Sequence, residues 1–163
     1  MREINISTTV IEFDSVEELQ EDEQILLNHA KSSALKAYSP YSGFSVGAAL
    51  LLENGEIVLG NNQENSAYPS GMCAERVAFF AAGAVYGDVK IDKVAITASS
   101  SRFKFNNSLS PCGDCRQAMV EYEVKQEKPI TLLLLGGNGK VLKVRAVKDL
   151  LPLLFQEKAL MGS

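Results

Sequence analysis

Three cysteines, Cys73, Cys112 and Cys115, constrain the fold of this chain more than any other feature. The 163-residue sequence has no further cysteine and a single histidine, His29. The C-x-x-C spacing of Cys112 and Cys115 suits a redox couple, half of a structural zinc site or part of a catalytic metal site. A structural zinc takes four protein ligands, whereas a catalytic zinc takes three and keeps its fourth position for water. Three cysteines supply the catalytic number, provided that the fold brings Cys73 to the other two.

The composition is that of one ordinary globular domain spanning residues 1–163. Hydrophobic residues make up 46% and charged residues 22% of the chain, so a packed core is expected and disorder is not. No run of 18 apolar residues is present, so no membrane span is expected. The first residues, "MREINISTTVIEF", carry acids and lack a long apolar core, unlike a signal peptide. We therefore expect a cytoplasmic protein, because thiols stay reduced in that compartment.

The charge of the chain argues against a nucleic-acid partner. The formal net charge is −4, with 20 acidic and 16 basic residues, whereas binding to polynucleotide phosphate depends on basic surface. A short basic cluster near the C-terminus is read as solvated surface; it consists of Lys140, Lys143, Arg145 and Lys148. We expect a small-molecule substrate and no nucleic-acid or membrane partner.

Hydrophobic periodicity predicts alternating helices and strands. Weak alternation over 3–13 indicates a strand, and Ser15 with Glu18 forms a capping-box pattern for a helix that reaches about Tyr38. The later predictions, in chain order, are a hairpin over 44–62 that turns at Asn54-Gly55, a helix over 73–86, a strand over 90–99, a helix over 112–125, two strands within 129–147 and a helical segment over 148–155. This order predicts an α/β fold with about five strands in one sheet and helices packed on its faces.

Both groups of cysteines fall at predicted helix starts. Cys73 begins one helix, and Cys112 and Cys115 begin another. Free backbone amides and the positive end of the helix dipole stabilise thiolates, the form of cysteine that binds zinc. Two such helix starts that face each other across the end of a sheet would bring the three sulfurs together.

A carboxylate stands beside the first cysteine. The segment "CAE" places Glu75 two residues after Cys73, and "PCGDC" runs from Pro111 to Cys115. C-x-E followed by P-C-x-x-C is the all-cysteine form of the signature of zinc-dependent nucleobase deaminases. A carboxylate in this position can lie beside the metal without coordinating it, and so remains free to move protons.

At these residues the chain resembles the cytidine deaminase family, in its small homotetrameric branch. The resemblance covers residues 38–155, whereas residues 1–35 form a longer N-terminal strand and helix segment than the family pattern needs. It is carried by "YSPYSGFSVGAALL", "GNNQENSAYPSGMCAER", "SPCGDCRQ" and the closing "LLPLLF". Asp114 departs from the pattern, which has a small residue there. The resemblance implies a three-layer α/β/α fold with a mixed sheet.

The resemblance also implies a catalytic site. One Zn²⁺ per chain would bind Cys73, Cys112 and Cys115 and activate a water that attacks C4 of cytosine. Glu75 would take the proton of the water, protonate N3 of the ring and help the amino group leave as ammonia. Three thiolates give the site a net charge of −1, and Arg76 would withdraw some of that charge by hydrogen-bonding the sulfurs.

The implied substrate site uses residues from several segments. Asn62 and Glu64 would hold the ribose hydroxyls, Phe44 would pack against the pyrimidine, and the backbone at Ala74 would hydrogen-bond the base. Phe155, and also Tyr68, would reach across a subunit boundary of a homotetramer with shared active sites. The implied reaction converts cytidine and 2′-deoxycytidine to the uridine products and ammonia, in pyrimidine salvage.

The sequence is also compatible with other interpretations. A relative that deaminates a nucleoside antibiotic of the blasticidin type shares CAE and PCGxCRQ. A thioredoxin-like module would use Cys112 and Cys115 as a dithiol, and a zinc-stabilised interaction module would need His29 as its fourth ligand. Phe44 and Phe155 also suit a core, and Asn62 and Glu64 suit a turn.

Overall fold

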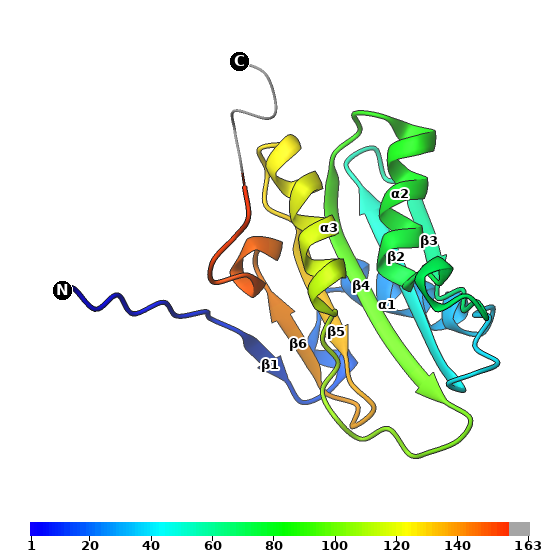
Figure 1. The fold of residues 1–163 in the computed structure, drawn as a ribbon. Coiled ribbons are helices and arrows are strands. Elements are labelled where there is room, and N and C mark those ends of the chain that lie inside the picture. Colours follow the sequence, from blue (N-terminus) through cyan, green and yellow to red (C-terminus); the bar gives the residue numbers. More distant parts are fainter. Residues whose placement is uncertain (157–163) are drawn as a thin grey trace.

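The fold is a six-stranded mixed sheet with helices on both faces (Figure 1). The structure is a computed structural model, and it describes residues 1–156. The strands lie in the order β1-β6-β5-β4-β2-β3, with β4 and β5 parallel and all other neighbours antiparallel. Their bounds are β1 Ile11–Phe13, β2 Phe44–Leu52, β3 Ile57–Asn61, β4 Ile91–Ser100, β5 Thr131–Leu135 and β6 Val141–Val144. The helices are α1 Glu21–Ala34, α2 Ala74–Tyr86 and α3 Gly113–Lys125, and short 3-10 turns cover Val16–Glu18, Tyr68–Ser70 and Val147–Leu150.

Strand alternation divides the buried side chains into two cores. Leu132 and Leu134 of β5 face α2 and α3, whereas Leu133 and Leu135 face α1. Successive side chains of a strand point to opposite faces, so an apolar run such as "TLLLL" supplies both cores. The predicted three-layer α/β/α arrangement is therefore confirmed.

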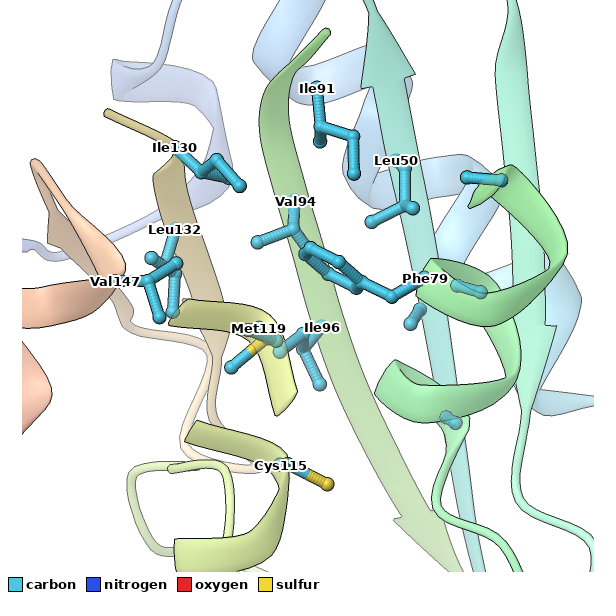
Figure 2. Close-up of a cluster of buried hydrophobic side chains, with 14 of the residues drawn as sticks. Leu50, Phe79, Ile91, Val94, Ile96, Cys115, Met119, Ile130, Leu132 and Val147 are labelled. Atoms are coloured by element: carbon cyan, nitrogen blue, oxygen red, sulfur yellow. The ribbon is translucent and has the colours of Figure 1, made fainter. Parts of the chain in front are cut away.

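The core under α2 and α3 supports the helix starts. Figure 2 shows Phe79 of α2 and Met119 of α3 reaching toward Val94 and Ile96 of β4. Cys115 lies at one end of the same cluster and is fully buried. Its position is thus set by core packing rather than by a free loop.

The sheet has six strands instead of about five, and the first is shorter than predicted. Residues 3–10 lie outside it, and only Ile11–Phe13 pair, with Lys143, Leu142 and Val141 of β6. The reason is that β6 ends at Val144, which the antiparallel register places opposite Val10, so the residues before Val10 have no strand beside them.

The predicted first helix is wrong at both ends. Ser15 makes no side-chain capping bond within residues 1–156; a 3-10 turn follows it, and α1 begins at Glu21. Buried Leu19 is extended there and packs with the core under α1, so tertiary packing overrides the local capping pattern. At the other end, the amide of Tyr38 donates to Asn62 O (3.0 Å) and the amide of Glu64 donates to Tyr38 O (2.8 Å), which replaces further helix with strand-like pairing.

The remaining elements follow the predicted order. The hairpin, α2, β4, α3 and the last two strands lie within a few residues of their predicted bounds. The closing segment has only the 3-10 turn Val147–Leu150, because a proline at 152 interrupts the helical pattern. Among residues 1–156, none of the helices combines the length and apolar character that crossing a membrane requires.

Both helix N-termini lie at the same end of the sheet. β4 runs parallel to β5, and α3 crosses between them, so α3 begins beyond the carboxyl end of β4. α2 begins beside it (Figure 1). The close seating of α2 requires glycine at position 60, because a Cβ there would lie 2.3 Å from Ala74 O. Crevices at the carboxyl ends of parallel strands are common ligand sites in α/β folds.

Candidate active site

The three cysteine sulfurs converge at the two helix starts. Cys73 is the N-cap residue of α2, Cys112 is the N-cap residue of α3, and Cys115 lies in the first turn of α3. The three Sγ atoms lie within 4.8 Å of one another. Tetrahedral zinc with bonds of about 2.3 Å would separate its sulfur ligands by about 3.8 Å. The arrangement therefore fits one zinc ion and leaves room for a fourth ligand.

The surroundings of the sulfurs favour a thiolate. The Cys115 thiol beside Cys73, together with the Arg76 guanidinium, lowers the pKa of Cys73 to about 5 although burial opposes the shift. The pKa of Cys115 is raised, first because of its hydrogen bond to Cys73 and then because of burial. The sulfur cluster thus holds negative charge before any metal binds, as a zinc site requires.

Arg76 lies against the sulfur cluster. Its Nη2 is 4.0 Å from Cys73 Sγ. Its Nε is buried and has no hydrogen-bond partner among residues 1–156. A guanidinium in this position offsets part of the negative charge of three thiolates.

Glu75 is the buried carboxylate of the site. Its side chain lies in the first turn of α2 and the residue is only 5% exposed. Burial raises the pKa of Glu75, and the negative charge of Cys73 adds to the increase. A carboxyl group whose pKa lies above its usual value can exchange protons nearer to neutral pH.

A cavity of about 290 Å³ opens onto the sulfurs and this carboxylate. Six of the residues singled out from the sequence line it, namely Phe44, Asn62, Glu64, Cys73, Glu75 and Cys112. Five further lining residues, Ser42, Val46, Ile96, Leu109 and Ser110, were not predicted. Leu109 and Ser110 directly precede "PCGDC", so their closeness in sequence to the ligands was an available signal. A larger hollow of about 590 Å³ at the other end of α3 contains none of the three cysteines.

Asn62 and Glu64 line the cavity and also hold the chain around it. Asn62 Oδ1 accepts from the amide of Val46 (2.7 Å), and its Nδ2 donates to Phe44 O (2.9 Å). Glu64 accepts from the amide of Tyr41 (2.9 Å) and from the amide and hydroxyl of Ser42. Burial alone would raise the pKa of Glu64, but these hydrogen bonds and the Arg102 charge outweigh it, so the pKa is lowered and the carboxylate stays ionised.

Tyr68, Phe155 and Ala74 do not line this cavity. Tyr68 is 78% exposed and packs edge-on against Tyr41, in a neighbouring hollow that shares Ser42 and Glu64 with the cavity. Phe155 is also largely exposed, and its carbonyl accepts from Gln117 Nε2 (3.2 Å). Ala74 is fully buried at the start of α2.

Two other residues lie outside the cavity. Asp114 is exposed in the first turn of α3 and does not line the cavity, although its negative charge acts on Arg76. His29 lies in α1, on the opposite face of the sheet from α2 and α3. Within residues 1–156, the residues grouped as possible metal ligands are the three cysteines alone.

A buried carboxylate beside three converging thiols, at two helix starts, defines a zinc-binding centre of the deaminase class. Residues 20–128 match the family described as the cytidine and deoxycytidylate deaminase zinc-binding region. The chain therefore belongs to the cytidine deaminase family.

Individual relatives agree with this assignment. The chain is 39% identical to a cytidine deaminase of Sporosarcina psychrophila over 85% of this chain and 95% of that protein. It is 37% identical to one of Halalkalibacterium halodurans over 80% and 92% of the two chains. The crystal structure of cytidine deaminase from Burkholderia pseudomallei superposes with a TM-score of 0.70 at 34% identity, covering 84% of this chain and all of that one.

Proposed function

We propose that this protein is a zinc-dependent enzyme that hydrolyses cytidine and 2′-deoxycytidine to uridine or deoxyuridine and ammonia. The observation that carries the proposal is the buried Glu75 carboxylate beside three sulfurs within 4.8 Å of one another, on a cavity of about 290 Å³. A cavity of this size is just below the range of about 300–1,000 Å³ that is typical of small-molecule sites, and it suits a nucleoside with ribose at its open side.

Cys73, Cys112 and Cys115 would hold one zinc ion per chain. The bound metal supplies Lewis acidity that makes a water molecule a nucleophile at neutral pH. In the reaction a C–O bond forms at C4 of the base and the bond from C4 to the amino nitrogen breaks. Glu75 accepts the first proton that the water loses and delivers it to N3. It then accepts the second proton, from the hydroxyl group now on C4, and delivers it to the departing amino group, which leaves as ammonia, so the carboxylate ends unchanged.

The cavity walls suit the two halves of a nucleoside. Phe44, Val46, Ile96 and Leu109 offer apolar surface to the pyrimidine. The backbone of Ala74, which lies between the lining residues Cys73 and Glu75, is the hydrogen-bonding group proposed for the base. Asn62 and Glu64 are the proposed partners of the ribose hydroxyls. Each keeps unused capacity after its contacts within the chain, since a carboxylate has about four acceptor sites and an amide has two donors.

We further propose a homotetramer whose neighbours complete each site. Tyr68 and Phe155 lie outside the cavity of their own chain and are largely exposed, as residues that serve a neighbouring subunit would be. Phe80 and Val85 on α2 add exposed apolar surface that an interface would cover. In this proposal the deaminase unit spans residues 1–163, with 38–155 as its core.

The proposed setting is pyrimidine salvage in the cytoplasm. All three cysteines are free thiols, and a reducing compartment preserves them for metal binding. The proposed alternative substrate is another aminopyrimidine nucleoside, such as an antibiotic of the blasticidin type, which would use the same sulfurs and carboxylate.

The test is to measure deamination and zinc content on the same purified protein. Cytidine and 2′-deoxycytidine are followed by ultraviolet absorbance for wild type and for Glu75→Gln, with zinc determined per chain. We expect one zinc per chain in both proteins, and a loss of about 10²–10⁴-fold in kcat for the variant. Glu56→Gln, in the exposed turn between β2 and β3, serves as the matched control and should retain full activity.

Two other outcomes of this test would contradict the proposal. Zinc without turnover of either nucleoside would contradict the proposed substrate and favour the antibiotic-type alternative. A protein without zinc would contradict the proposal at its base and favour a dithiol role for Cys112 and Cys115.

A further inference from the structure

The loop that joins β4 to α3 is unusually long. It covers residues 101–112, whereas loops of about 2–6 residues are usual between strands and helices of α/β folds. Its last part supplies Leu109, Ser110 and Cys112 to the cavity. Long ordered loops that border a site commonly take part in its function, and residues 101–107 form the first part of this one.

One side of the loop is tied to the chain directly before Phe44. The amide of Ser101 donates to Gly43 O (3.0 Å), and the Arg102 guanidinium donates to Pro40 O (2.8 Å) and to Tyr41 O. Gly43 has a positive φ of 64°, and a Cβ there would lie 2.7 Å from the Arg102 side chain. The segment that leads into Phe44 and the loop are therefore joined as one unit.

The other side of the loop is seated on the turn between β5 and β6. The amide of Gly137 donates to Asn107 O (3.1 Å). A Cβ at Gly137 would lie 1.6 Å from Phe105 O, so only glycine allows the loop to approach this closely. Phe105 is thereby held between the turn and the Phe44 ring.

Two loop phenylalanines contact the Phe44 ring. Phe105 meets it edge-on, with ring centroids 5.3 Å apart at 84°, and Phe103 stacks on it, with centroids 6.0 Å apart at 6°. Both are favoured aromatic geometries. The Phe44 backbone is held as well, through the bond from Asn62 Nδ2 to Phe44 O. The rotamer of the ring that lines the cavity is therefore restricted by contacts on two of its sides.

We propose that Phe103 and Phe105 are positioning residues that hold the Phe44 ring in place for the substrate base. The inference rests on the proposed function, in which Phe44 packs against the pyrimidine. A ring already held in its binding conformation costs less ordering when the base arrives. The benefit applies equally to the ground state and the transition state, so it appears in KM and not in kcat.

A double-mutant cycle with Phe44 tests this indirect action. The cycle compares the wild type with three single variants, Phe103→Ala, Phe105→Ala and Phe44→Ala, and with the two double variants that contain Phe44→Ala. KM and kcat are measured with cytidine, and the Kd of uridine is measured by calorimetry. We expect Phe103→Ala and Phe105→Ala each to raise KM and Kd about 2- to 10-fold, the range that one aromatic pair supports, with kcat nearly unchanged. In the Phe44→Ala background neither change should have a further effect.

Controls separate positioning from a loss of stability. Phe103 is 54% exposed, so its truncation should leave the fold intact, and Phe105→Leu replaces Phe105→Ala if that variant fails to fold. Leu51→Ala removes packing on the opposite face of the sheet, under α1, and should lower thermal stability without raising KM.

Two results would overturn the inference. One is that Phe103→Ala or Phe105→Ala raises KM and Kd in the Phe44→Ala background as much as in the wild type. The other is that these variants lower kcat at constant KM. A wild-type protein that neither deaminates cytidine nor binds uridine would instead show that the proposed function has failed, because that result is seen before any variant is compared.

Discussion

At the scale of single residues, we propose that Arg76 offsets part of the negative charge of the sulfurs. Arg76→Gln removes the guanidinium that lies 4.0 Å from Cys73 Sγ. We expect zinc content to stay at one per chain and kcat to fall about 10- to 100-fold, as is common when a group behind the metal ligands is lost. Metal analysis and kinetics on the same sample test this, with Arg145→Gln on the exposed surface as the control. An unchanged kcat would contradict the role of Arg76.

The pKa of Glu75 predicts a pH dependence. Burial and the Cys73 charge raise it above the usual 4.5, and the carboxylate must be ionised to accept a proton. We therefore expect log(kcat/KM) to fall with a slope of about 1 as the pH drops below the raised pKa. Thermal unfolding over the same range shows whether the chain stays folded, and a flat profile down to pH 4.5 would contradict the assignment.

The residue scale also shows what local sequence can predict. Cys73, Cys112, Cys115 and Glu75 were identifiable because zinc chemistry needs particular residue types at particular spacings. Phe103 and Phe105 were not, because nothing in "SSRFKF" indicates that this segment folds back onto Phe44. Their contacts join residues far apart in the chain.

At the scale of elements, the buried carboxylate of Glu123 links the end of α3 to two other segments through hydrogen bonds. It accepts from the amides of Ile130 (2.8 Å), Val147 (2.7 Å) and Lys148 (3.1 Å). Glu123→Gln turns an acceptor into an NH₂ group that faces backbone donors. We expect a loss of about 2–4 kcal/mol in the free energy of unfolding.

Denaturant unfolding measures this loss, and Glu56→Gln in the exposed turn between β2 and β3 is the control. Equal midpoints for the two variants would show that the Glu123 hydrogen bonds contribute little to stability.

Element boundaries were predictable where side-chain pattern and packing agree. α2 and α3 begin next to their cysteines as expected, since the helix-start signal and the apolar face coincide there. The helix after Ser15 was mispredicted, because the burial of Leu19 decides the local conformation instead of the capping pattern. β1 was overpredicted, because strand length depends on the partner strand.

At the scale of the whole molecule, the proposed tetramer is directly measurable. Light scattering should give a particle of four 17.7 kDa chains. Phe80→Glu places a charge on the exposed apolar side of α2, beside the hollow between α2 and α3. We expect it to give smaller particles with reduced activity, because each site would lose the residues contributed by its neighbours.

Asn28→Glu, on the exposed side of α1, adds the same charge on the other face and should leave the assembly intact. Wild-type protein that is fully active as a monomer would contradict the shared sites.

By itself the sequence determined the chemistry and the order of elements. Thiolates, a neighbouring carboxylate and helix starts are encoded by residues close together in the chain, and hydrophobic periodicity is a local property as well. Only the tertiary structure decided that Cys73 meets Cys112 and Cys115, that a sixth strand joins the sheet and that residues 101–107 hold Phe44. These features depend on contacts between distant segments, whose free energy comes from burial and pairing that no local pattern records.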